Sequence, residues 1–165
     1  MGSGATKGRT FDWIPNHLQD TNGEIVPRSI LNLWALAAKD ELDNNRAKDG
    51  FLLSPLSIRQ VIEEVSDRRV IELSEEYPWL KIIVPQLAGE EVPMFPEKFR
   101  GLLQKIDWQS QPPTERPISQ KPSDIIDQLL KIGVLRLIPD GRIHVPDIYL
   151  YGFKMKRRGG IRRPR

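Results

Sequence analysis

The chain has 165 residues, 39% of them hydrophobic and 28% charged, and this balance is typical of a globular protein with one domain and short appendages. The sequence has no cysteine, which excludes a disulfide framework and thiolate metal chemistry, and no apolar run reaches the ~18 residues that a membrane span needs. Because Met1–Thr10 also lacks the apolar core of a signal peptide, we expect a cytoplasmic protein without membrane contact.

The formal net charge of +3 is unevenly distributed. Seven basic residues and no acidic ones follow Phe153, so residues 1–153 carry 3 − 7 = −4. We therefore expect any affinity for polyanions to lie in a basic tail over residues 154–165, whose candidate contact residues are Lys154, Lys156, Arg157, Arg158, Arg162, Arg163 and Arg165.

The first two thirds of the sequence predict a flexible start over residues 1–9 and a helical body over 10–106. Residues 10–20 mix aromatic and polar side chains and predict a short helix or turn. A helix is expected from Pro27 to about Asn44, with Ile30, Leu33, Trp34, Ala37 and Ala38 on one face and Leu31, Leu36 and Leu42 widening it. Since more than half of its circumference is apolar, we expect this helix to be central to the core and Trp34 to be buried.

Ser54-Pro55 supplies a good N-cap followed by a first-turn proline, which predicts one helix running on to Glu76 with a solvated acidic face. Tyr77-Pro78-Trp79 ends it. A short apolar segment over residues 79–87 and a small helix over 97–106 follow. Residues 107–120 contain three prolines and few apolar side chains, and they are predicted to be a linker.

Residues 121–153 predict a helix followed by a two-stranded hairpin. Pro122 suits a first helical turn, Gly133 suits the left-handed residue that ends a helix, and Pro139-Asp140-Gly141 is a turn between short strands at 134–138 and 142–145. A helix, a strand, a tight turn and a strand form the closing unit of a winged-helix domain. The expected fold is therefore α+β and predominantly helical, with a helical body followed by a winged-helix-like unit that packs on it.

Three groups of segments carry a family resemblance: FDWIPNHLQD (11–20) with PRSIL (27–31), EEVSDRRVIELSEEYPW (63–79), and DGRIHVPDIY (140–149) with GFKMKRRGG (152–160). Together they resemble the C-terminal region of large bacterial P-loop ATPases of the AAA/STAND type, which are often linked to signalling or defence. The resemblance covers roughly Lys7 to Arg163. It implies a module that follows a nucleotide-binding domain and is helical with a winged-helix end. Val26 departs from the pattern, because Ser or Thr would cap the next helix better.

The sequence contains no G-x-x-x-x-G-K-[ST] motif, so the hydrolytic activity of such ATPases does not carry over to this chain. Arg28 is nevertheless a candidate nucleotide-sensing residue, with Arg68 and Arg69 as weaker ones. A cation in the first turn of a helix is disfavoured by the helix dipole and needs compensation. Either a neighbouring carboxylate supplies it, or Arg28 reaches a nucleotide phosphate of an adjoining ATPase domain.

The two histidines do not predict a catalytic or metal site. His144 alternates with Ile143 and Val145, so we expect it on the surface of the wing, facing away from the core. His17 and Asp20 are too few for a metal site, and a local turn hydrogen bond is the expected arrangement. The clustered glutamates of residues 63–76 are expected to form a solvated helix face. No enzyme activity, metal or cofactor is predicted.

Winged helices often bind DNA by placing one helix in the major groove. The helix in the recognition position, residues 122–131, presents Asp124 and Asp127 against Lys131 and carries a net charge of −1, which is repulsive beside phosphates. The sequence therefore predicts a non-catalytic regulatory or interaction module, the C-terminal lid or docking domain of a P-loop ATPase present in cis or in trans. The alternative is a nucleic-acid-binding module that acts through the basic tail. A free-standing enzyme is a third class.

Overall fold

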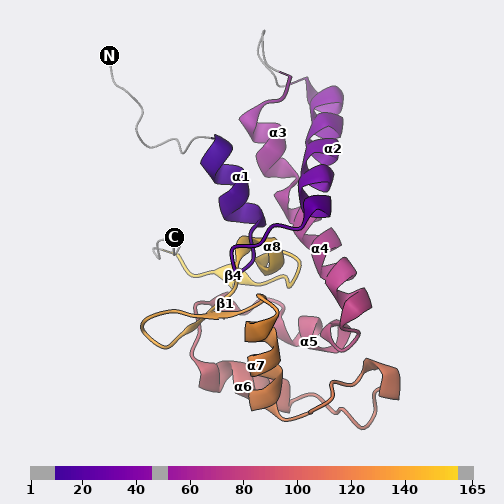
Figure 1. The fold of residues 1–165 in the computed structure, drawn as a ribbon, viewed down its shortest axis with the longest axis vertical. Helices are drawn as coiled ribbons and strands as arrows, with labels where there is room; N and C mark the ends of the chain where they lie inside the picture. Colours follow the sequence, from indigo (N-terminus) through magenta and orange to yellow (C-terminus); the bar gives the residue numbers. More distant parts are fainter. Residues whose placement is uncertain (1–9, 46–51, 160–165) are drawn as a thin grey trace.

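The protein is predominantly helical, as a computed structural model describing residues 10–45 and 52–159 shows (Figure 1). The helices are α1 (Thr10–Leu18), α2 (Pro27–Asn44), α3 (Pro55–Gln60), α4 (Ile62–Glu76), α5 (Leu80–Leu87), α6 (Pro96–Gln104), the 3₁₀ helix η1 (Pro113–Glu115), α7 (Pro122–Lys131) and α8 (Asp147–Leu150). The strands are β1 (Glu91–Val92), β2 (Arg136–Leu137), β3 (Ile143–His144) and β4 (Lys156–Arg157). The expected α+β class with mostly helical content is confirmed.

Helices α1, α2 and α3 lie in the upper half of Figure 1, α5, α6 and α7 lie in the lower half, and α4 runs from one half to the other. The core continues through both halves, because buried residues of α2, α4, α5, α6 and α7 belong to one apolar cluster. No helix in the described ranges is long and apolar enough to cross a membrane.

Two features of α2 and its successors differ from the sequence predictions. Trp34 is 40% exposed, so α2 lies at the edge of the core and not at its centre. The helix expected from Pro55 to Glu76 is divided at Val61 into α3 and α4. The predicted cap is confirmed, because Ser54 accepts a hydrogen bond from the Ser57 amide at 3.0 Å. Glu41 of α2 secures this start by accepting from the Ser54 amide at 3.0 Å and the Ser57 hydroxyl at 2.9 Å.

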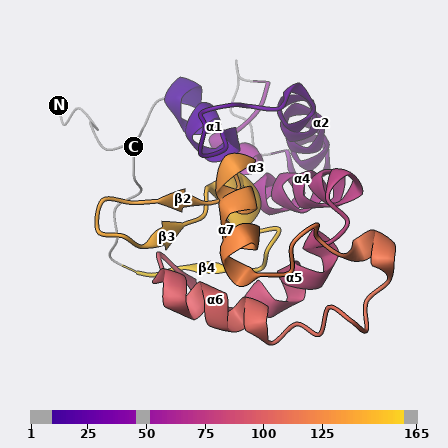
Figure 2. The same cartoon turned by 60° about the horizontal axis from the view of Figure 1, so that its bottom comes forward.

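The predicted helix and hairpin are present as α7 and the antiparallel pair β2–β3 (Figure 2). Gly133 ends α7 with φ of 77° and Gly141 lies in the hairpin turn with φ of 81°, which confirms the left-handed conformation expected of both. The loop after α1 rests on the end of α7, where the Thr21 amide donates to the Gly133 carbonyl at 3.0 Å. The larger winged-helix arrangement stays a prediction.

The start of the predicted basic tail is part of the fold. β4 pairs in parallel with β1, with Glu91 opposite Lys156 and Val92 opposite Arg157. Met155, just before β4, is 5% exposed. The described part of the predicted tail, residues 154–159, is therefore held to the body of the protein by backbone pairing. The sequence offers so few apolar residues here that backbone pairing with a strand 65 residues earlier could not be inferred from it.

The predicted linker, residues 107–120, is anchored at its beginning. Trp108 is 6% exposed and joins the core, and the Arg116 guanidinium donates to the carbonyls of Gln109 and Gln111 at 2.8 and 2.6 Å. Ile118, by contrast, is fully exposed. The segment therefore combines a fixed first half with at least one apolar side chain in solvent.

Candidate functional site

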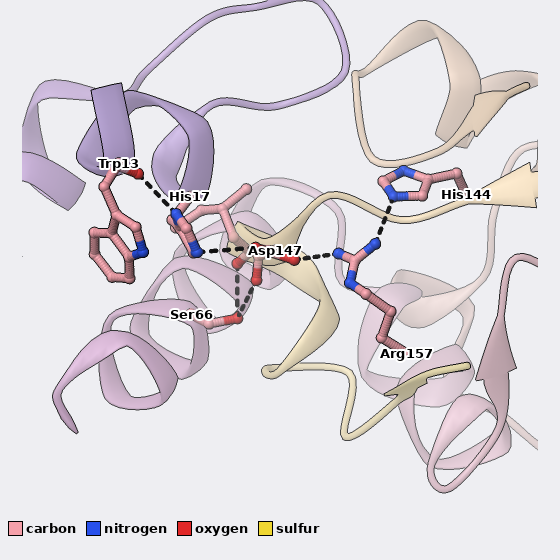
Figure 3. Close-up of polar contacts among 7 residues, drawn as sticks. Trp13, His17, Ser66, His144, Asp147 and Arg157 are labelled. Atoms are coloured by element: carbon pink, nitrogen blue, oxygen red, sulfur yellow. Dashed lines mark hydrogen bonds and ion pairs between the residues drawn. The ribbon is translucent and has the colours of Figure 1, made fainter. Parts of the chain in front are cut away.

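The most unusual polar feature is a buried carboxylate at the start of α8 (Figure 3). Asp147 is 3% exposed, and its Oδ1 accepts a hydrogen bond from the Arg157 guanidinium on β4. Its Oδ2 lies 3.4 Å from Nε2 of His17 on α1. A buried carboxylate is tolerated when it is paired, and here the partners come from opposite ends of the described chain.

The hydrogen-bond geometry of His17 assigns roles to its ring. Nδ1 lies 2.7 Å from the Trp13 carbonyl, and since a carbonyl only accepts, Nδ1 carries a proton. Nε2 faces Asp147, and the ring stacks on the Trp13 indole with centroids 3.8 Å apart. His17 therefore has a local hydrogen-bond partner in Trp13 and a distant ion partner in Asp147, which the sequence did not indicate. Asp20 instead accepts from the amides of Asn22 and Glu24.

His144 is buried, with 5% of its surface exposed, which corrects the expectation that it faces solvent on the wing. Arg157 Nη1 donates to its Nε2 at 3.0 Å, because a guanidinium can only donate. Burial lowers the pKa of His144 from 6.5, and the positive charges of Arg157 and Arg136 act in the same direction, so that the pKa falls to about 4 although the charge of Asp147 opposes the shift. His144 is therefore neutral at pH 7. The alternation of polar and apolar residues predicted an exposed His144, but both faces of the short strand β3 are covered.

A serine on α4 holds α8 in place beside this carboxylate. The Ser66 hydroxyl donates to the Ile148 carbonyl at 2.8 Å and accepts from the Gly152 amide at 2.8 Å. Gly152 fits closely against α4, since an added Cβ would lie 2.5 Å from Val70 Cγ2 and 2.7 Å from the Ser66 carbonyl oxygen. The carboxylate of Asp147 is thus fixed by the backbone beneath it as well as by its ion partners.

This cluster is suited to joining segments and not to acid–base catalysis. Both ring nitrogens of His17 face protein partners, and His17, His144 and Asp147 are each at most 5% exposed. A general base needs a lone pair within reach of a substrate proton. One signal in the sequence could have pointed to the cluster: Asp147 lies in the apolar run HVPDIYL, where a charged residue requires a buried partner.

The three arginines proposed as nucleotide sensors are partly brought together. Arg28 and Arg69 both approach Glu72, at 3.7 and 3.8 Å, so the expected carboxylate neighbour of Arg28 is confirmed. Arg69 also lies over the Tyr149 ring, 5.8 Å from its centroid. Arg68 points elsewhere and pairs with Glu64 at 2.7 Å. The side chain of Arg28 is 69% exposed while that of Arg69 is 16% exposed, so Arg28 is the more accessible of the pair.

A polar cleft of about 350 Å³ lies beside Arg69. Its charged lining mixes both signs, with three acids and two bases: Asp20, Glu24, Glu76, Arg69 and Lys131. Tyr77 and Tyr149 contribute aromatic walls, and burial raises the pKa of Tyr149. Because the acids outnumber the bases, the cleft does not favour a phosphate. No group of three potential metal ligands occurs among the residues that the structure describes.

Among the described cations of the basic tail, two have carboxylate partners and two others are exposed to solvent. Lys154 pairs with Asp67 at 2.6 Å, and Arg157 is held by Asp147, so two of the four described tail cations are neutralised. Lys156 and Arg158 are exposed. Arg162, Arg163 and Arg165 lie outside the described residues. Within residues 154–159, the tail cations are therefore not gathered into one patch.

The outward side of α2 carries an apolar stripe that the core does not cover. We call this set of exposed residues the outer stripe: Leu31, Trp34, Ala35, Ala38 and Leu42. Leu31 is 68% and Leu42 is 86% exposed. The stripe lies opposite the buried face of α2, which is formed by Ser29, Leu33, Leu36, Ala37 and Glu41. A long surface helix normally presents polar residues on that side, so the stripe requires an explanation.

Comparison with known proteins places the chain in no group. No family model, curated protein or solved structure matches it.

Proposed function

We propose that this chain is a non-catalytic interaction module, a docking or lid domain of a P-loop ATPase that is present in cis or in trans, and that the outer stripe of α2 is its contact face. The observation that carries the proposal is the exposure of Leu31 and Leu42 on an ordered helix. Burying a leucine side chain contributes roughly 1.5–3 kcal/mol, so two such residues on one stripe favour a partner.

The partner that suits the outer stripe is a protein helix with an apolar stripe of its own. The stripe contains no charged or hydrogen-bonding side chain apart from the indole N–H of Trp34. Its residues are spaced by three and four positions, which is the spacing that packs into the grooves of a second helix.

The contacts of α2 support a role in transmitting a signal. Glu41 connects the end of α2 to α3, and Glu72 of α4 is approached by Arg28 from the start of α2. A partner that displaces α2 therefore acts on α4, the helix that runs between the two halves of the molecule (Figure 1). Arg28 remains the candidate nucleotide sensor, because its contact with Glu72 is long and its side chain is mostly exposed.

The alternative function, nucleic-acid binding through the tail, receives no comparable support from the described residues. Two of the tail cations have carboxylate partners, and Asp124 at the start of α7 is held ionised by hydrogen bonds from Ser119 and Ser123 that lower its pKa. A helix with this charge is repelled by a phosphate backbone.

The test begins with the native gene. We expect a P-loop ATPase to be encoded in the same reading frame or in an adjacent gene. The turnover and assembly of that ATPase are then measured with three forms of the module: the wild type, Leu31→Glu/Leu42→Glu, and Ile118→Glu. Ile118 is a matched control because it is a fully exposed apolar residue away from α2. We expect a several-fold change in turnover or assembly for the stripe variant alone. The absence of such an ATPase, or equal behaviour of the two variants, would remove the proposal.

A further inference from the structure

We infer that the helix that packs on the outer stripe is α2 of a second copy of this module, antiparallel to the first and related to it by a two-fold axis. The inference rests on the proposed function of the stripe as a contact face, and it names the partner. A two-fold interface uses the same patch on both copies, so the patch must be complementary to itself.

The spacing of the outer stripe has this self-complementarity. Leu31, Ala35, Ala38 and Leu42 are separated by four, three and four positions, so the order leucine, alanine, alanine, leucine is the same in both directions along α2. A two-fold axis between residues 36 and 37 places Leu31 level with Leu42 of the second copy, and Ala35 level with Ala38. Each residue then meets a partner of its own kind.

The sizes of these side chains suit close packing of two helices. The two alanines lie at the middle of the stripe, where the helix axes come nearest, and their small side chains permit an interaxial distance near the lower end of the usual 8–10 Å. The leucines lie about three turns apart, roughly 16 Å, and close the two ends of the contact. Trp34, at the margin of the stripe and 40% exposed, adds aromatic area on one side.

The charges around the stripe predict how this association responds to salt. The outer stripe contains no ion pair, and Lys39, which is exposed along one edge of it, approaches the Lys39 of the second copy in this arrangement. Salt screens the repulsion between these like charges, and a kosmotropic salt such as sulfate also strengthens apolar association. Pairing through the stripe should therefore hold or tighten in high salt, whereas association through oppositely charged surfaces would weaken.

The size of the contact predicts its strength. A stripe of about three turns buries less than the ~1,200 Å² that stable complexes reach, so we expect a reversible dimer with a dissociation constant in the micromolar range or weaker. If each module is attached to an ATPase chain and these chains assemble, the effective concentration of the modules rises, and the weak pairing is then populated.

Sedimentation equilibrium of the whole chain, from 5 to 500 µM, tests the pairing. We expect the average mass to rise toward twice that of one chain for the wild type and for Ile118→Glu. Leu31→Glu/Leu42→Glu should weaken self-association at least tenfold while its circular dichroism stays that of the wild type. A wild type that remains monomeric at 500 µM, or a stripe variant that associates as well as the wild type, overturns the inference.

Cysteine cross-linking tests the antiparallel register, because the natural chain has no cysteine. Leu31→Cys alone should not form a disulfide dimer, since its two copies would lie roughly 16 Å apart and a disulfide needs Cα atoms about 4.4–6.8 Å apart. A mixture of Leu31→Cys with Leu42→Cys should cross-link efficiently, and Ile118→Cys is the control. Efficient cross-linking of Leu31→Cys to itself would show a parallel pair and refute the antiparallel arrangement.

The outcomes separate this inference from the proposed function. A monomeric module whose stripe variant still alters ATPase turnover leaves the contact face in place and removes only the second copy as its partner. A module that dimerises through the stripe while the variant leaves turnover and assembly unchanged keeps the pairing and removes the link to the ATPase.

Discussion

Arg157 donates to the carboxylate of Asp147, and this contact ties the strand β4 to the start of α8. The side chain of Asp147 is 2% exposed and that of Arg157 is 18% exposed, so the pair is largely withdrawn from solvent. Since Arg157 also donates to His144, one guanidinium satisfies two buried acceptors. Arg157, the last residue of β4, thus makes its side-chain contacts in the interior of the protein.

Replacing Arg157 by alanine should therefore destabilise the fold, because Asp147 would be left buried with one partner fewer. We expect a loss of about 3 kcal/mol in the free energy of unfolding, at the lower end of the range for breaking a buried pair, since Arg157 retains some contact with solvent. Arg158→Ala, at the exposed neighbouring position, should change stability by less than about 0.5 kcal/mol. Urea titration of both variants measures this, and equal losses would contradict the assignment.

The protonation of His144 should make stability depend on pH. The pKa of His144 is about 4 in the folded protein and 6.5 when unfolded, so the unfolded chain binds more protons between these values. Stability should fall as the pH drops from 6.5 to 4, by roughly 3 kcal/mol from this residue. Arg157, Arg136 and Asp147 are the charged groups that act on it.

His144→Gln isolates this effect, since glutamine keeps an acceptor for Arg157 and does not titrate. Denaturant titrations at several pH values should give a shallower decline for the variant below pH 6.5. Parallel curves for the variant and the wild type would show that His144 is not the group responsible.

Two glycine-to-alanine substitutions should change the stability of the fold in opposite directions. Gly152→Ala places a methyl group 2.5 Å from Val70, and we expect a loss of about 1–3 kcal/mol, as for other overpacked sites. Gly101→Ala lies in α6 with nothing within 4 Å, so it should stabilise the helix by about 0.5–1 kcal/mol. Thermal unfolding distinguishes them. A neutral Gly152→Ala would mean that α4 and α8 separate easily.

Alanine substitutions at two adjacent residues of α2 should lower the free energy of unfolding by different amounts. Leu33 is fully buried, and Leu33→Ala should cost about 2–5 kcal/mol. Trp34→Ala should cost about 1 kcal/mol, because Trp34 is 40% exposed and leaves no enclosed cavity. If Trp34→Ala proved as damaging as Leu33→Ala at low protein concentration, the orientation of α2 would be wrong.

Local features of the fold could be predicted because they depend on neighbouring residues. Ser54 followed by Pro55, Gly133 after an apolar helical pattern, and Gly141 in a Pro-Asp-Gly turn each specify backbone geometry within a few positions. The mostly helical class follows from the same periodicities. Such signals require no knowledge of what lies across the core.

The features that were missed depend on residues far apart in the sequence. α2 is apolar on two sides, and nothing local says which side faces the core, so Trp34 and Leu33 could not be told apart. The partner of His17 is 130 residues away, at Asp147, and a histidine pattern alone gives no hint of it. His144 is likewise buried beside Arg157, which comes from the parallel strand β4 and donates to its ring.

The parallel pairing of β1 with β4 sets the order in which the chain can fold. The Arg158 amide donates to the Val92 carbonyl at 2.9 Å, and closing so long a loop costs conformational entropy that is offset only when the intervening segments make their own contacts. We predict that α2, α3 and α4, which contact one another over short sequence separations, become protected early, and that the Arg158 amide is protected last, which pulsed hydrogen exchange during refolding would show. During synthesis, Asp147 leaves the ribosome before Arg157 does. In a nascent chain that stalls between these two residues, most of the core could form while the carboxylate of Asp147 still lacked its arginine partner.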